Sequence, residues 1–211
     1  MKTFGKYYYL SAALFVITLL FFNSCSANDK DSIVDEANLV LSTTDESALL
    51  FMLEEEKLAR DTYAYLDDLW SINQFANIKK SEQSHMNAVE NLLISSNISY
   101  SILPVGEFNN SDLQSLYNQF VEQGSVSLIN ALKIGATIED LDIVDLQRTI
   151  DATSNSLVIS VFEKLKCGSG NHLRSFVFAI ESEGESYTPQ FLTQDEYDTI
   201  INGTQERCGS K

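Results

Sequence analysis

The sequence predicts an all-α protein in which four long helices pack as a bundle, with extra short helices added to it. Four segments repeat apolar residues at alternating spacings of three and four, which places those residues on one face of a helix. No segment shows a convincing alternation of apolar and polar residues, the pattern typical of a strand. Capping residues precede several of the segments, so both the apolar spacing and the capping residues indicate helices there.

Capping signals set the expected helix boundaries in chain order. Thr43 and Glu46 have the spacing of a capping box and begin the first long helix, which extends to about Trp70. A second long helix covers roughly residues 75–95. The remaining helices are expected at 111–124 after Asn110 and Ser111, at 125–150, at 156–183 after a turn-rich break over 151–155, and at 194–203 after a capping box of Thr193 and Glu196.

The apolar stripe of each long helix is interrupted near its middle by polar residues. These are Glu56 on the first long helix, Glu82 and His85 on the second, Glu139 and Asp142 on the third, and Ser169 and His172 on the fourth. Four such helices pack with their polar residues at one level of the bundle. A buried carboxylate or imidazole is unfavourable unless it is paired or bound to a cation, so we expect these residues to act together.

A metal site is the favoured explanation of this polar level. The chain has two histidines, and both His85 and His172 fall on the stripes. The four carboxylates on the stripes would raise one another's pKa, and a divalent cation would relieve both their repulsion and the burial of charge. The alternative is a buried hydrogen-bonded network without metal. A single histidine on an apolar face fits that alternative, whereas two histidines with these carboxylates favour a metal site.

The residues at these positions resemble those of the ferritin-like superfamily, and of rubrerythrin-type helices in particular. Residues 56–63 are similar to the first-helix motif Glu-x-x-Ala-Arg-x-x-Tyr, which implies that Glu56 is a ligand in place of the two glutamates before it. Glu82 and His85 match the Glu-x-x-His motif of the second helix. The resemblance implies a ferritin-like four-helix bundle.

A closer resemblance is to a bacterial and archaeal ferritin-like family, domain-of-unknown-function family 2202. It is carried by residues 54–61, 81–83, 138–143 and 171–174. The likeness covers about residues 45–202 and implies a dinuclear metal site. The metal ligands are then expected to be Glu56, Glu82, His85, Glu139, Asp142 and His172.

The fourth long helix departs from the rubrerythrin-type motif. That motif places Glu three residues before the histidine, where this chain has Ser169. Asp142, one turn after Glu139, can supply the missing oxygen; otherwise the second metal position is weaker, or a single ion binds. Gly168 and Gly170 are unfavourable inside a helix and predict a bulge or a close approach to a neighbouring helix.

Two further side chains near the site each have two interpretations. Arg174 either pairs with Asp142 or Asp145 beside the site or forms a surface ion pair. Tyr63, two turns after Glu56, either hydrogen-bonds a ligand or takes part in electron transfer, or it packs in the core with a satisfied hydroxyl group.

The N-terminus is expected to be an export signal of the lipoprotein type. Lys2 and Lys6 precede an almost continuously apolar run over 7–22, and Cys25 follows as the expected lipidation site. Ordinary signal cleavage and an uncleaved anchor are the alternatives. We therefore expect a signal peptide over 1–24, an acidic tether over 25–42, the metal-binding bundle over 43–203 and a C-terminal tail over 204–211. The expected location is the bacterial cell envelope, on the periplasmic side or the outer surface, with the membrane reached through the lipid anchor.

Cysteine usage and charge agree with this location. If Cys25 carries a lipid, Cys167 and Cys208 remain as a disulfide pair for an oxidising compartment, with two free thiols as the alternative. The net charge is −16, and it becomes −18 without residues 1–24, which carry two lysines and no acid. Such an acidic chain is not expected to bind nucleic acid, although it attracts cations. No protein partner or electron donor can be identified from the sequence.

Three functions are compatible with these features. The first is an oxidoreductase in which two divalent metal ions, di-iron or Fe/Mn, react with dioxygen or peroxide and Glu82 bridges them. Carboxylate and imidazole ligands without thiolate favour Fe or Mn, although Zn is compatible. The second is a non-catalytic envelope lipoprotein that sequesters metal or uses it structurally. The third is a metal-free helical module that displays a surface for a partner.

Overall fold

The computed structural model describes residues 41–208, and all regular secondary structure in this range is helical. Its six helices are α1 (Thr43–Trp70), α2 (Asn73–Ser95), α3 (Ser111–Gly124), α4 (Leu128–Ala152), α5 (Ser156–Ser182) and α6 (Gln194–Ile201). The all-α prediction is confirmed over these residues. The predicted signal peptide, most of the tether and Cys25 lie outside the described residues.

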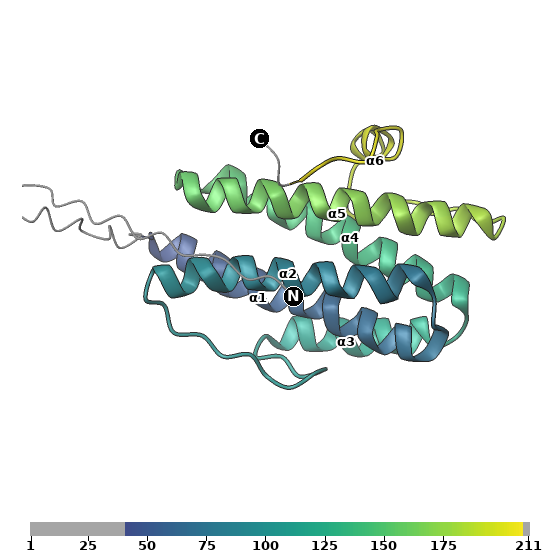
Figure 1. Cartoon of the computed structure of the whole chain (residues 1–211), viewed down its shortest axis with the longest axis horizontal. Coiled ribbons are helices and arrows are strands. Elements are labelled where there is room, and N and C mark those ends of the chain that lie inside the picture. Colours follow the sequence, from purple (N-terminus) through teal and green to yellow (C-terminus); the bar gives the residue numbers. More distant parts are fainter. Residues whose placement is uncertain (1–40, 209–211) are drawn as a thin grey trace, which may run out of the picture. The chain divides into compact units, whose positions relative to one another are not determined.

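The four long helices pack in pairs, α1 with α2 and α4 with α5 (Figure 1). The two pairs meet through contacts of α1 with α4 and of α2 with α5, which gives a helical bundle. The short helix α3 packs against α1 and α4, and α6 packs against α5. Within residues 41–208, no helix combines the length and the apolar character needed to span a membrane.

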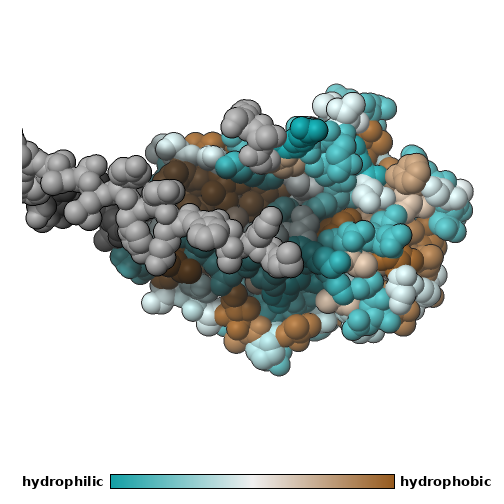
Figure 2. All heavy atoms as spheres, viewed as in Figure 1, coloured by the Kyte–Doolittle hydropathy of each residue, from teal (hydrophilic) through white to brown (hydrophobic). Residues whose placement is uncertain are grey.

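The interior consists of two apolar clusters with the polar level between them. One cluster includes Tyr63, Phe75 and Phe176, and the other includes Met52 and Phe162, all buried. Burying each such side chain stabilises the fold by roughly 1.5–3 kcal/mol, which offsets the unfavourable burial of the charged residues between the clusters. On the face seen in Figure 2, hydrophilic side chains are interspersed with apolar ones.

The capping box that begins α1 lies one residue earlier than predicted. The Ser42 hydroxyl accepts a hydrogen bond from the backbone N–H of Asp45 at 3.1 Å, and the Asp45 carboxylate accepts one from the Ser42 N–H at 3.2 Å. Both candidate pairs have the required spacing, but Asp45 is buried, whereas Thr43 and Glu46 are exposed. The predicted capping box at α6 is confirmed.

Helix α4 starts at Leu128, not at Ser125 as predicted. Ser125 ends α3, because its backbone N–H donates to the carbonyl oxygen of Val121. Ser127 then caps α4 by accepting a hydrogen bond from the N–H of Asn130. Two serines in this short connection serve different helices, and spacing alone does not distinguish them.

The disulfide predicted between Cys167 and Cys208 is present in the structure. It joins α5 to the segment that follows α6, across a sequence separation of 41 residues. Asn171 reinforces this attachment, since its side-chain amide donates to the carbonyl oxygen of Glu206 at 3.0 Å. The C-terminal part of the described chain is therefore held against the outer side of α5.

Candidate metal centre

The polar level brings five of the predicted ligand residues together. Two sets of three residues each place ligand atoms within 4.8 Å of one another. The sets are Glu56, Glu82 and His85, and Glu82, Glu139 and His172. Glu82 belongs to both, so its carboxylate lies where the two sets meet.

Each oxygen of Glu82 faces one histidine. His85 Nδ1 lies 2.9 Å from Glu82 Oε2, and His172 Nδ1 lies 2.8 Å from Glu82 Oε1. On their other sides, His85 Nδ1 is 3.2 Å from a Glu56 oxygen and His172 Nδ1 is 3.4 Å from a Glu139 oxygen. The glutamate side chains are only 1–2% exposed, so these charges interact in a largely dry interior.

Two neighbouring hydroxyl groups orient the residues around Glu82. The Tyr63 hydroxyl donates a hydrogen bond of 2.6 Å to Glu139 Oε1, and its ring packs in the core against Phe75 and Phe176. The structure therefore agrees with core packing with a satisfied hydroxyl group, and the hydrogen-bond acceptor is one of the expected ligands. His172 Nε2 hydrogen-bonds the Ser81 hydroxyl at 3.0 Å, which directs Nδ1 toward Glu82. Sequence reasoning missed this role of Ser81, whose one signal was its place directly before Glu82.

Gly168 on α5 makes room for the His85 ring. A Cβ atom at this position would lie 2.7 Å from His85 Nε2 and 2.8 Å from its Cε1. At Gly170 the nearest atom would be 3.9 Å away, an ordinary contact. Helix α5 is α-helical across both glycines, so the expected bulge is wrong and the expected close approach is correct at Gly168.

Burial and mutual repulsion dominate the ionisation of the carboxyl groups. Burial raises the pKa of Glu56 to about 7 although His85 acts in the opposite direction. Burial also raises the pKa of Glu139, and the charge of Glu82 adds to this effect. Glu82 is the exception, because the charges of His172 and His85 outweigh burial and hold its pKa below the usual range.

The two histidines are the counter-ions of this carboxylate level. Burial lowers the pKa of His172, but Glu82 and Glu139 outweigh it and raise the pKa to about 10. Glu56 and Glu82 likewise outweigh burial and raise the pKa of His85 well above its usual value. Because a histidine must lose a proton to bind a metal through Nδ1, metal and protons compete for this site.

Asp142, the sixth predicted ligand, lies beside the two sets. One of its oxygens accepts a hydrogen bond of 2.5 Å from the Ser169 hydroxyl, and the other is buried without a hydrogen-bond partner. Burial and the charges of Glu56 and Glu139 raise the pKa of Asp142 well above its usual value. Ser169 therefore positions Asp142, whose role as a ligand stays a prediction.

Two charged residues of α1 near Glu56 bind the loop that precedes α3. Glu54 accepts hydrogen bonds from the backbone N–H groups of residues 109–110. Lys57, only 1% exposed, donates to Asp61 at 2.5 Å and to backbone carbonyl oxygens of the loop over 104–107. These contacts hold the chain before α3 against α1.

Neither interpretation of Arg174 is correct. Its guanidinium donates to the carbonyl oxygen of Ile200 at 2.8 Å and to the side-chain oxygen of Asn171 at 2.6 Å. Arg174 follows His172 by two residues. Side chains two residues apart point to opposite sides of a helix. It therefore binds the C-terminal end of α6, away from the polar level.

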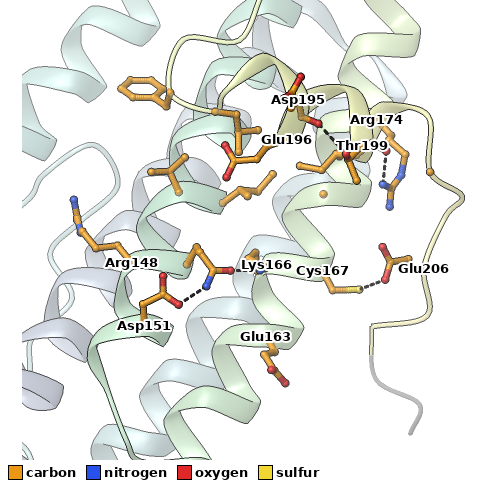
Figure 3. A pocket seen from close by; sticks show the side chains of 18 residues that line it. Arg148, Asp151, Glu163, Lys166, Cys167, Arg174, Asp195, Glu196, Thr199 and Glu206 are labelled. Atoms are coloured by element: carbon orange, nitrogen blue, oxygen red, sulfur yellow. Dashed lines mark hydrogen bonds between the residues drawn. The ribbon is translucent and has the colours of Figure 1, made fainter.

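A separate cavity of about 850 Å³ lies where α4, α5 and α6 meet (Figure 3). Its lining carries both signs of charge, including Lys166, Arg174, Glu163 and Glu196, and Cys167 of the disulfide forms part of the wall. None of the predicted metal ligands lines this cavity.

Comparison with known proteins identifies the family. The family described as "Uncharacterized protein domain (DUF2202)" matches residues 45–204. The chain belongs to this family. The chain is also 44% identical over 169 residues to "Uncharacterized protein MJ0754" from Methanocaldococcus jannaschii, covering 79% of this chain and 91% of the relative. A solved structure, that of "hypothetical protein MJ0754 from Methanococcus jannaschii DSM 2661", matches with a TM-score of 0.78 and 44% identity over 79% of this chain and 97% of the other.

Gly168→Ala is expected to disturb the site of this DUF2202 domain, whereas Gly170→Ala is not. Both changes favour the helix by about 1 kcal/mol, but only the first drives a methyl group into the His85 ring. Gly168→Ala should therefore be about 1–3 kcal/mol less stable than Gly170→Ala in urea unfolding of the metal-free protein. Equal stability of the two variants would contradict the packing described.

The metal-free protein should lose stability as the pH rises from about 4.5 to about 7. The folded chain keeps Glu56 protonated up to a pKa of about 7, whereas the unfolded carboxyl group titrates near 4.5, so the folded state binds more protons between these values. Glu56→Gln should reduce the slope of unfolding free energy against pH by up to about 1.4 kcal/mol per pH unit. Glu122→Gln, at an exposed position of α3, is the matched control and should leave the slope unchanged.

Proposed function

We propose that this protein is a ferritin-like oxidoreductase of the cell envelope, with a dinuclear Fe or Fe/Mn centre that reacts with dioxygen or peroxide. The position of Glu82 between two sets of ligand atoms is the observation that carries the proposal. A carboxylate that belongs to two sets is suited to bridge two ions. The pairing of four long helices around this level supports the ferritin-like assignment.

The residues present fit two divalent ions. Glu56 and His85 would hold one ion, Glu139 and His172 the other, and Glu82 would bridge them. One oxygen of Glu56 is buried without a hydrogen-bond partner, which a metal would supply. Asp142 would add an oxygen ligand in place of the glutamate that Ser169 replaces. Carboxylate and imidazole ligands favour Fe or Mn, and Zn is compatible.

The bound metals would supply the redox chemistry, and the chain itself supplies a dry and oriented site. Because the glutamates are almost completely buried, only small reactants would reach the centre. Burial and the charge of Glu139 raise the pKa of Tyr63 well above its usual value, so its hydroxyl stays protonated and keeps donating to Glu139. Ser81 holds His172 through Nε2 and leaves Nδ1 for metal.

Export and lipid anchoring at Cys25 belong to the same proposal. The disulfide between Cys167 and Cys208 supports an oxidising compartment, where such bonds persist. The sequence of residues 1–25 supports a lipoprotein signal. The acidic charge supports cations, and not nucleic acid, as binding partners.

A non-catalytic metal-binding role is the second candidate. The near-complete burial of the glutamates would also suit a structural or sequestered metal, because burial slows the exchange of the metal with solvent. Oxygen or peroxide consumption after addition of Fe(II) separates the two candidates, since only the oxidoreductase consumes the oxidant.

The full chain, purified in detergent and freed of metal, should bind two Fe(II) or Mn(II) ions tightly and consume oxygen when Fe(II) is added. Glu82→Ala combined with His85→Ala removes the bridge and one imidazole, so tight binding should weaken by more than about 100-fold. Elemental analysis and an oxygen electrode measure the two effects, with Glu122→Gln as the control. Unchanged binding in the double variant would contradict the centre, and binding without oxidant consumption would contradict the oxidase.

A further inference from the structure

The cavity where α4, α5 and α6 meet has one wall that a buried carboxylate holds in place. Asp140 of α4 is fully buried and accepts hydrogen bonds from the backbone N–H groups of Gln190 and Leu192, at 2.6 and 2.7 Å. Phe191 and Leu192 both line the cavity. The chain before α6 is therefore fixed in the position that forms this wall.

The opposite wall is held by side chains of α5. Arg174 donates to the carbonyl oxygen of Ile200 at 2.8 Å, and Asn171 donates to that of Glu206 at 3.0 Å. Ile200 and Glu206 line the cavity, and the disulfide ties the same C-terminal segment to α5. Asp140, Asn171 and Arg174 lie in the segments that carry the family resemblance, yet all three build this cavity and not the proposed centre. Such a preformed cavity is typical of a small-molecule site.

Part of the lining is apolar. Ile143 of α4 and Leu192 are buried, whereas the Phe191 ring is 45% exposed. An apolar group bound in the cavity would cover this ring, and burial of apolar surface is favourable by about 25 cal/mol per Å². The ligand is therefore expected to carry apolar groups.

Two opposite charges line the cavity from different helices without forming an ion pair (Figure 3). The Lys166 ammonium of α5 donates to the neutral side-chain oxygen of Gln147, and no carboxylate among residues 41–208 pairs with it. On α6, one oxygen of Glu196 accepts hydrogen bonds from Thr193, and the other accepts none from the described chain. Each charge can therefore take a partner of opposite sign from a ligand.

The two arginines of the lining are already engaged. Arg148 pairs with Asp145, and Arg174 binds the end of α6. Five carboxylates and three basic groups line the cavity in all, so a ligand that is only an anion is disfavoured. A ligand with both charges fits this lining better.

We propose that this cavity binds a short apolar peptide with free termini, whose carboxylate pairs with Lys166 and whose ammonium group pairs with Glu196. Because these side chains stand on different helices and form no ion pair, the ligand must separate its charges, as the two ends of a peptide do. The cavity volume of about 850 Å³ lies within the range of roughly 300–1,000 Å³ that is typical of small-molecule sites. None of the proposed metal ligands lines the cavity, so peptide binding is independent of the proposed function.

Calorimetric titration of the metal-free full chain with trileucine tests the proposal. The protein is held in lipid nanodiscs, because detergent would compete for an apolar cavity, and empty nanodiscs give the blank. Trileucine with free termini should bind about 10-fold more tightly than N-acetyl-trileucine or trileucine amide, because each modification removes one charge that the cavity pairs with. Equal affinity for the three peptides, or no binding of trileucine, would overturn the inference.

Two variants assign the ends of the peptide. Lys166→Met should bind trileucine and its amide equally, and Glu196→Gln should bind trileucine and its acetylated form equally. Glutamine keeps the capping box that Glu196 forms. Lys80→Met and Glu122→Gln, at exposed positions of α2 and α3, are the matched controls and should keep the wild-type preferences. A Lys166→Met protein that still prefers the free carboxylate would contradict the assigned contact.

Decanoate separates a peptide from an amphipathic acid. It carries an apolar chain and a carboxylate but no ammonium group, so it should bind at least about 10-fold more weakly than trileucine. Decanoate that binds as tightly as trileucine, with an affinity that Glu196→Gln leaves unchanged, would overturn the inference.

Discussion

The interaction on which this structure depends is the contact of one buried carboxylate, Glu82, with two imidazoles. Without His85 and His172, four carboxyl groups would face one another inside an apolar bundle, an arrangement that desolvation and repulsion make unstable. With them, Glu82 stays ionised and the level is held together. The surrounding sequence serves this contact: Gly168 admits one ring, Ser81 turns the other, and the apolar clusters on either side supply the stability that the polar level lacks.

The same contact supports the proposal of a metal centre at this site. In the metal-free protein the two histidines carry the positive charge, and their raised pKa reflects the carboxylates around them. Two divalent ions would take over that role and bind the same Nδ1 atoms, with release of protons. The polar level would then be held together by charge in the metal-bound form, as it is in the metal-free form.

Much of the fold could be predicted from spacing alone, because apolar stripes and capping residues are local signals. The stripes on the long helices correctly indicated which faces are buried, and Glu56, Glu82, His85, Glu139 and His172 do meet at one level. What spacing could not predict is set by packing between helices. The direction of Arg174, the hydroxyl of Ser81 and the burial of Glu55 depend on which neighbour each residue meets, and the starts of α1 and α4 depend on a choice between equivalent serine and threonine caps.

The central claim is the proposal that two metal ions would share the Glu82 carboxylate, one held with His85 and the other with His172. Anomalous diffraction at the manganese edge, from crystals of this protein grown with Mn(II), tests it most directly because it locates each ion independently of any reaction. The account predicts two peaks beside the Glu82 carboxylate, one on the side of His85 and one on the side of His172. A map with no peak at Glu82, or with a single ion there at saturating Mn(II), would contradict it.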